Sequence, residues 1–290
     1  MQNLLWANQA LLRSEGVHYC PRFIRANNID PLNIAVSNVK KAHLKNAAIT
    51  AGRARLEALF SEMDINTVVL SNESALGDPF NDNKEGFFPF RKEALAGLKQ
   101  MFEGYALVPV FFIRGQATLL PSFYGQRVRQ GASYSFETFS VRMQACDLSW
   151  RPIVSDIKKA FGGVDFELHR FEEFAEGPEA FSSALFSRLI FGSSSGTKLA
   201  TGNAYMKNAG VAPRGLAAMR SVSKQIEKLS GVSEGTKTKL KKRLRRVLFP
   251  ALEYLPGGTA DKFDDVQLGK LQKLYQVDVE HLFADHSPSP

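Results

Sequence analysis

The chain has little cysteine and histidine: Cys20 and Cys146 are its two cysteines among 290 residues, and its five histidines share no metal-ligand spacing. Two cysteines cannot build the disulfide framework of a small secreted scaffold. No zinc-ligand pattern is present, and neither cysteine stands in a basic motif with a partner histidine. The sequence therefore predicts no resident metal, no thiol catalysis and a reducing compartment, which we take to be the cytoplasm.

Long hydrophobic runs are also lacking, and none reaches the length that a membrane-spanning helix requires. The first residues, MQNLLWANQALLRSEG, are amphipathic and too polar for the apolar part of a secretory signal. Hydrophobic residues make up 44% of the chain and charged residues 23%. These proportions are usual for a soluble globular protein with one domain, or one domain and an appendage.

Acidic residues are outnumbered, because 29 Asp and Glu against 37 Lys and Arg give a formal net charge of +8. The excess favours an anionic partner such as a nucleotide, a sulfated glycan, nucleic acid or a membrane surface. Much of it lies in residues 237–246, KTKLKKRLRR, on a predicted helix whose apolar positions Leu240 and Leu244 share one side. No helix-turn-helix signature, RNA-binding signature or interleaved aromatics accompany it, so nucleic acid ranks below a polyanionic glycan or an acidic membrane.

Short apolar runs alternate with helical patterns over the first two thirds of the chain. The runs predict strands at residues 17–19, 67–70, 107–113 and 164–168. The alternation predicts an α/β fold, a parallel sheet flanked by helices, over residues 1–191. Residues 192–285 carry no strand signal and form a predicted helical extension, and the tail 286–290 is expected to be disordered.

The most informative stretch is residues 107–130, LVPVFFIRGQATLLPSFYGQRVRQ, which reads as strand, turn and helix. Arg114 ends the apolar run, and ligands of open parallel sheets bind at the carboxyl ends of the strands. Ser122 follows eight residues later, in the first turns of the helix, where its hydroxyl and free backbone N–H groups can share one anion. Arginine suits this place because its planar fork binds two phosphate oxygens.

This stretch resembles the 3′-phosphate-binding segment of sulfotransferases that use 3′-phosphoadenosine 5′-phosphosulfate. FFIRGQATLLPSFYGQRVRQG, then YSFETF and FGGVDFELHRFEEF, resemble a bacterial branch of that family over roughly residues 2–191. The resemblance implies a phosphate-loop fold, no metal, and sulfuryl transfer to a hydroxyl or amine of a small-molecule or glycan acceptor. Arg114 and Ser122 would bind the donor's 3′-phosphate, and Tyr124 and Arg127 on the same helix are secondary candidates.

Two further residues enter through the same resemblance. The family carries Ser-x-Glu after the strand at 67–70, and Glu73 is our candidate for the base that takes the acceptor's proton. The alternative, that Glu73 caps a helix or pairs with a basic neighbour, stays open. Residues 192–198, GSSSGTK, lack phosphate-loop spacing and read as a flexible connector, but Lys198 can contact the donor as a C-terminal loop does in related enzymes.

The chain departs from the family at its beginning. In the family, the helix predicted at 3–14 follows the central strand and a Lys-Thr-Gly-Thr-Thr-like loop, of which only Gln2 is present here. That loop holds the 5′-phosphosulfate. A late start codon, a truncation and a degenerate protein would each explain the difference, and we favour the start codon. The competing function is a protein that binds nucleotide or anionic glycan without turnover.

The acceptor contacts are expected from two loops, residues 20–41 and 77–90. The second is rich in phenylalanine, and its rings can either close over an acceptor or anchor the loop to the core. We expect the anchoring role.

Overall fold

The computed structural model describes residues 2–21, 29–62, 64–81, 86–162, 164, 166–191, 199, 212–252, 255 and 262–284. Lys198, its loop 192–198 and the tail 286–290 lie outside these residues. The chain divides into two compact units, Met1–Ile113 with Trp150–Lys207 and Arg114–Ser149 with Asn208–Pro290. The sequence predicted one boundary, between residues 191 and 192. In the structure each unit instead combines two segments that are separate in the sequence. No helix in the described ranges is long and apolar enough to span a membrane.

In the described residues three strands form at the predicted apolar runs and a fourth begins three residues after the start of its run, which agrees with an α/β class with parallel strands. β1 (Val17–Cys20) pairs in parallel with β2 (Thr67–Leu70), and β3 (Val110–Ile113) pairs in parallel with β4 (Glu167–Arg170). Each pair is a separate two-stranded sheet in the described part of the chain. Pairing with β3 begins at Glu167, opposite Val110, so β4 lies further along the chain than the apolar run at 164–168.

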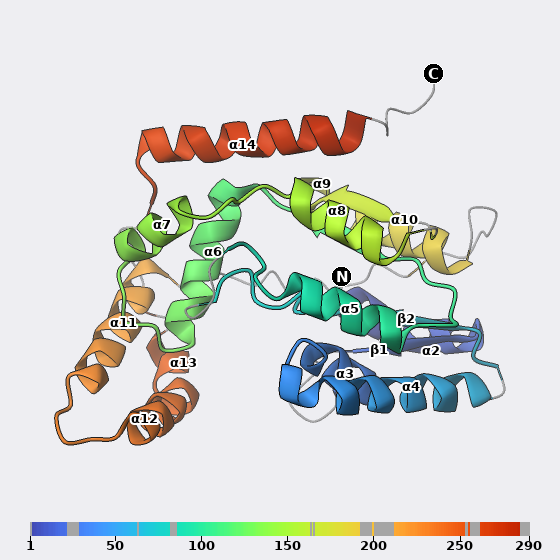
Figure 1. The fold of residues 1–290 in the computed structure, drawn as a ribbon, viewed down its shortest axis with the longest axis horizontal. Helices are drawn as coiled ribbons and strands as arrows, with labels where there is room; N and C mark the ends of the chain where they lie inside the picture. Colours follow the sequence, from blue (N-terminus) through green and yellow to red (C-terminus); the bar gives the residue numbers. More distant parts are fainter. Residues whose placement is uncertain are drawn as a thin grey trace. The chain divides into compact units, whose positions relative to one another are not determined.

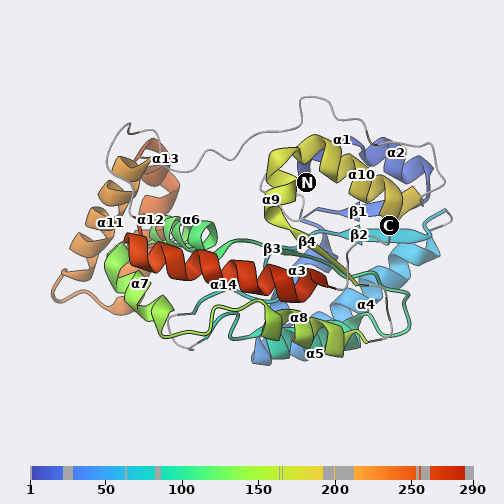
Figure 2. The same ribbon diagram turned by 90° about the horizontal axis from the view of Figure 1, so that it is seen from above.

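Helices cover both faces of the β1–β2 pair (Figure 2). Successive side chains of a strand point to opposite faces, and here Tyr19 joins one apolar cluster while Cys20 joins the other. The Tyr19 cluster includes leucines of α1 (Gln2–Ala7) and α2 (Gln9–Ser14) and side chains of α10 (Pro178–Phe191). The Cys20 cluster includes α3 (Pro31–Asn38), α4 (Lys45–Ser61) and α5 (Arg91–Met101), and a short 3-10 helix η1 (Ala42–Leu44) precedes α4.

Helix α3 corrects the expectation that residues 20–41 form a loop. Asp30 is its N-cap, and the Asp30 carboxylate accepts a hydrogen bond from the backbone N–H of Leu32. Pro31 occupies the first helical turn, where its missing N–H costs no hydrogen bond. Within this loop, residues 22–28 lie outside the described part.

The β3–β4 pair contacts α9 (Phe171–Glu176) and the ring of Trp150, which is the N-cap of α8 (Arg151–Ala160) in the same unit. The ring of Trp150 lies 5.8 Å from Phe111 of β3 and 4.8 Å from Phe87, centroid to centroid. Phe80, Phe87 and Phe88 are all buried. The described phenylalanines of loop 77–90 therefore anchor it, as expected, and residues 82–85 lie outside the described part.

The second unit is helical. It contains α6 (Gln116–Arg129), α7 (Phe136–Gln144), α11 (Pro213–Glu227), α12 (Glu234–Val247), α13 (Phe249–Leu252) and α14 (Asp265–Phe283) (Figure 1). Asp278 of α14 is fully buried and accepts hydrogen bonds from Ser149 Oγ at 2.6 Å and Gln116 Nε2 at 3.1 Å. These bonds tie α14 to the start of α6, so the segment 114–149 packs with the C-terminal helices.

Candidate functional site

Glu73 lies on a turn at the carboxyl end of β2 and its side chain is exposed. Asn72 holds this turn, because its amide donates to Asn33 Oδ1 at 2.9 Å and its oxygen accepts from the Ser74 N–H at 2.9 Å. Gln2 Nε2 lies 3.4 Å from Glu73 Oε1, so the first residue of α1 meets this end of β2. In the described ranges Glu73 caps no helix and forms no ion pair. This weakens the alternative that Glu73 is a helix cap or the partner of a basic residue.

Tyr19 of β1 is a buried residue that the sequence analysis did not single out. Its hydroxyl has no hydrogen-bond partner in the described structure, although buried hydroxyls are usually bonded. Burial raises the pKa of Tyr19, and the charges of Cys20 and Glu73 raise it further. Tyr19 therefore lies within the electrostatic reach of Glu73, and its phenol remains protonated at neutral pH.

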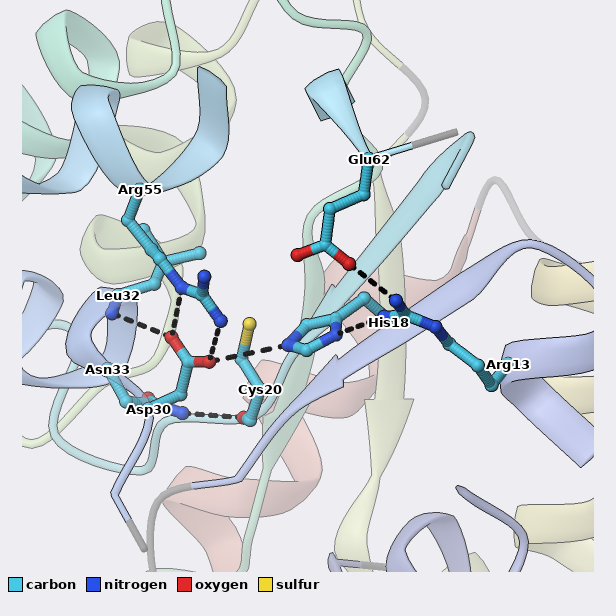
Figure 3. A network of polar contacts seen from close by, with 8 residues as sticks. All are labelled: Arg13, His18, Cys20, Asp30, Leu32, Asn33, Arg55 and Glu62. Carbon is cyan, nitrogen blue, oxygen red and sulfur yellow. Dashed lines mark hydrogen bonds and ion pairs between the residues drawn. The ribbon is translucent and has the colours of Figure 1, made fainter. Parts of the chain in front are cut away.

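A polar network occupies the other face of β1 (Figure 3). The buried carboxylate of Asp30 accepts from Arg55 NH2 at 3.0 Å and from Leu32 N at 2.8 Å, and it lies 3.3 Å from His18 Nε2. Burial alone would raise the pKa of Asp30, but the hydrogen bonds from His18, Arg55 and Leu32 hold it well below its usual range. The network joins β1, α3 and α4 around one anion.

Cys20 completes the network from the same face of β1 as His18 (Figure 3). One ligand atom each of His18, Cys20 and Asp30 lies within 4.8 Å of the others. Three such ligands and a water would form an open zinc site. However, Arg55 already neutralises Asp30, and the negative charge of Asp30 favours the protonated thiol of Cys20. We therefore read the network as structural, and the absence of a metal site stays a prediction.

The thiol of Cys20 is expected to resist alkylation in the folded protein. Burial raises its pKa first, and the charge and hydrogen bond of Asp30 raise it further against a smaller lowering by Arg55. Alkylation requires the thiolate and solvent access. Mass spectrometry after iodoacetamide treatment should find label on the partly exposed Cys146 and not on Cys20. In denaturant both should react, and equal labelling of the two thiols in the native protein would contradict the result.

Arg114 directly follows β3, and α6 begins two residues later. Arg114 Nε donates to Thr118 Oγ1 at 3.0 Å, in the first turn of α6. Ser122 lies four residues after Thr118, so the two hydroxyl residues share one side of the helix, and both are exposed. The structure therefore places one guanidinium and one hydroxyl group in direct contact, with a second hydroxyl residue one turn further along. Thr118 was not predicted as part of this site.

Tyr124 and Arg127 have other contacts in the same unit. Tyr124 is buried, and its hydroxyl donates to the Tyr134 carbonyl at 3.0 Å and accepts from Arg220 at 2.8 Å. Arg127 Nε lies 3.5 Å from the Tyr134 hydroxyl and Arg127 NH1 lies 3.3 Å from Gln130 Oε1. Both side chains hold the turn after α6, and their contact with a nucleotide stays a prediction. The same holds for Lys198, outside the described residues.

Comparison of the chain with protein-family models, with curated proteins and with solved structures finds no match in any of the three.

Proposed function

We propose that the protein is a sulfotransferase that moves a sulfuryl group from 3′-phosphoadenosine 5′-phosphosulfate to a hydroxyl or amine of a small-molecule or glycan acceptor. The observation that carries the proposal is the contact of Arg114 with Thr118, which sets a guanidinium beside the exposed hydroxyl side of α6. In this proposal, Arg114 and Ser122 bind the donor's 3′-phosphate, and Thr118 orients Arg114.

The start of α6 suits a phosphate for three reasons. A guanidinium fork can make two parallel hydrogen bonds to phosphate oxygens. Hydroxyl groups such as that of Ser122 can donate to a third oxygen. The amino end of a helix also carries a partial positive charge, which stabilises an anion.

The arrangement of strands supports the phosphate-loop part of the proposal. β2 (TVVL) and β3 (VFFI) are the most apolar strands, and such strands are usually buried on both faces. Yet every residue of β2 and all but Ile113 of β3 are only half-buried. One further parallel strand between β2 and β3 would join the two pairs into a single sheet. The family's first and central strand, which carries the phosphate loop, would fill that position.

Glu73 is proposed as the base because an exposed carboxylate at the carboxyl end of a parallel strand can accept the acceptor's proton. The acceptor oxygen or nitrogen would attack sulfur, forming a new bond to it. The bond from sulfur to the bridging oxygen of the 5′-phosphate would break, leaving 3′-phosphoadenosine 5′-phosphate. Glu73 would receive the proton, and Gln2, which contacts its carboxylate, would orient it.

The second candidate is a protein of the same fold that binds nucleotide or an anionic glycan without turnover. It is favoured by one observation: the contact of Arg114 with Thr118 concerns the binding of a phosphate and includes no group that acts on sulfur.

Calorimetric titration with 3′-phosphoadenosine 5′-phosphate, alongside transfer assays with radiolabelled donor and a panel of hydroxyl and amine acceptors, tests both candidates. We expect saturable binding and sulfated product. Binding with no product for any acceptor would favour the non-catalytic candidate. If the nucleotide does not bind at millimolar concentration, the sulfotransferase is wrong, and if heparin, a sulfated glycan, does not bind either, both candidates are wrong.

A further inference from the structure

Helix α12 presents a stripe of four cationic side chains. Lys239, Lys242, Arg243 and Arg246 are exposed and follow the spacing i, i+3, i+4 and i+7, which places them on one face of the helix. The stripe extends about 10 Å along the helix axis. In the described part of the chain, none of the four forms an ion pair with a carboxylate. We call these four residues the cationic stripe.

Two other lysines of α12 are paired with acids of their own unit. Lys237 pairs with Glu234 at 3.0 Å, and Lys241 pairs with Glu227 of α11 at 2.7 Å. These pairs neutralise Glu234 and Glu227, so neither acid repels an anionic partner. The apolar positions of α12, Leu240 and Leu244, are half-buried. The helix is therefore held by its apolar side and presents its charge outward.

The connection between α11 and α12 is a short turn. Lys228 is the C-cap of α11 and Ser233 is the N-cap of α12, with LSGV between them. Gly231 adopts a φ of 72°, a conformation that favours glycine, and the Ser233 hydroxyl accepts from the Thr236 N–H. Figure 1 shows α12 turning away from the direction of α11. Two helices joined by a turn of three or four residues with glycine are the general plan of helix-turn-helix elements.

We propose that α11 and α12 form an interaction surface for double-stranded DNA, with the cationic stripe of α12 directed at the phosphates that border the major groove. A single α-helix fits the major groove of B-form DNA, whereas the deep, narrow major groove of A-form RNA does not admit side chains. This inference goes beyond the proposed function and does not depend on it.

An acidic membrane is the weaker partner for the same stripe. Membrane-surface helices insert an apolar face between the headgroups. The apolar side of α12 packs within the protein, and Val247, 73% exposed, is the large apolar side chain of α12 that lies open in the described residues. On the sequence alone nucleic acid ranks below an acidic membrane, and the half-buried apolar side of α12 reverses that order.

Fluorescence anisotropy with a short labelled DNA duplex over a salt series tests the proposal. Four phosphate contacts predict a slope of log affinity against log salt of about −3.6 and a loss of about 100-fold between 50 and 200 mM salt. Replacing all four stripe residues by alanine should remove most of that slope. A major-groove dye should compete with the protein, and a minor-groove ligand should not.

The matched control removes the same charge elsewhere: Lys92 and Lys99 of α5 with Lys270 and Lys273 of α14, all exposed, are replaced by alanine. This variant should bind the duplex as the unmodified protein does. Equal losses in the two variants would mean that net charge alone is responsible and would overturn the proposal. Tighter binding to heparin or to phosphatidylserine vesicles at the same salt, or no duplex binding at low salt, would also overturn it.

Discussion

Asp30→Ala is expected to lower the free energy of unfolding by about 3–5 kcal/mol, because it leaves the half-buried charge of Arg55 without its partner and removes a helix cap. The Asp30 side chain is 7% exposed and that of Arg55 27%, so water compensates little for the loss. The same substitution also removes the acceptor of the Leu32 N–H at the start of α3. Urea denaturation followed by circular dichroism measures the change.

Two variants separate the causes. Asp30→Asn keeps an N-cap of similar strength. The decrease in the free energy of unfolding that this variant still shows therefore reports the charge interaction with Arg55. Glu62→Ala removes another carboxylate paired with an arginine, Arg13, but this pair is solvent-exposed and should contribute little. If Asp30→Ala destabilises the protein no more than Glu62→Ala, the polar network around Asp30 does not stabilise the fold.

The stability that Asp30 contributes should depend on pH in a defined direction. Its pKa is depressed in the folded state, so below the ordinary Asp pKa of about 3.9 the unfolded chain takes up protons first. The contribution is therefore complete at neutral pH and is lost as the pH falls toward the depressed folded-state pKa. In Asp30→Asn, the decline of stability below about pH 4 should be shallower than in the unmodified protein.

Arg114→Ala is expected to weaken binding of 3′-phosphoadenosine 5′-phosphate by about 10-fold to 100-fold. Hydrogen bonds to charged groups contribute about 1.5–3 kcal/mol, and each 1.4 kcal/mol is tenfold in affinity. Arg114→Lys should recover only part of the loss, because an ammonium lacks the planar fork. Ser122→Ala should have a smaller effect, since it removes one hydroxyl. Titration calorimetry gives each dissociation constant.

Adenosine 5′-monophosphate serves as the control ligand, because it differs from 3′-phosphoadenosine 5′-phosphate only in lacking the 3′-phosphate. Its affinity should be the same for the unmodified protein and for Arg114→Ala. Arg129→Ala is the matched variant, because it removes an exposed arginine from the far end of the same helix. Equal losses for both nucleotides in Arg114→Ala would mean that Arg114 does not contact the 3′-phosphate, and equal losses in Arg129→Ala would point to net charge.

Local patterns predicted the strands and most helices because those patterns are themselves local. The apolar runs TVVL and VFFI gave β2 and β3, and the helical spacing after Arg114 gave α6. Helix α3 was missed because it has only eight residues and its segment is rich in turn formers. Asp30 before Pro31 was the available signal, since an N-cap side chain followed by proline typically starts a helix.

The contacts between distant segments had no such pattern. Asp30 and Arg55 are 25 residues apart, and Gln116 and Asp278 are 162 apart. Periodicity carries no information on pairs of this kind, so neither the network around Asp30 nor the packing of α6 with α14 could be predicted. Arg114 and Ser122 were proposed from their spacing and a family resemblance, but Thr118, to which Arg114 donates, became evident only when the helix was seen to begin at Gln116.

The outer edges of β2 and β3 have a consequence for handling the protein. In the described part of the chain no third strand joins either pair, so these edges offer backbone donors and acceptors beside partly exposed valine and phenylalanine. Such edges recruit extended segments of other molecules and seed aggregation. Concentrated preparations should therefore be prone to precipitate through intermolecular β-structure, and anything that covers those edges should keep the protein in solution.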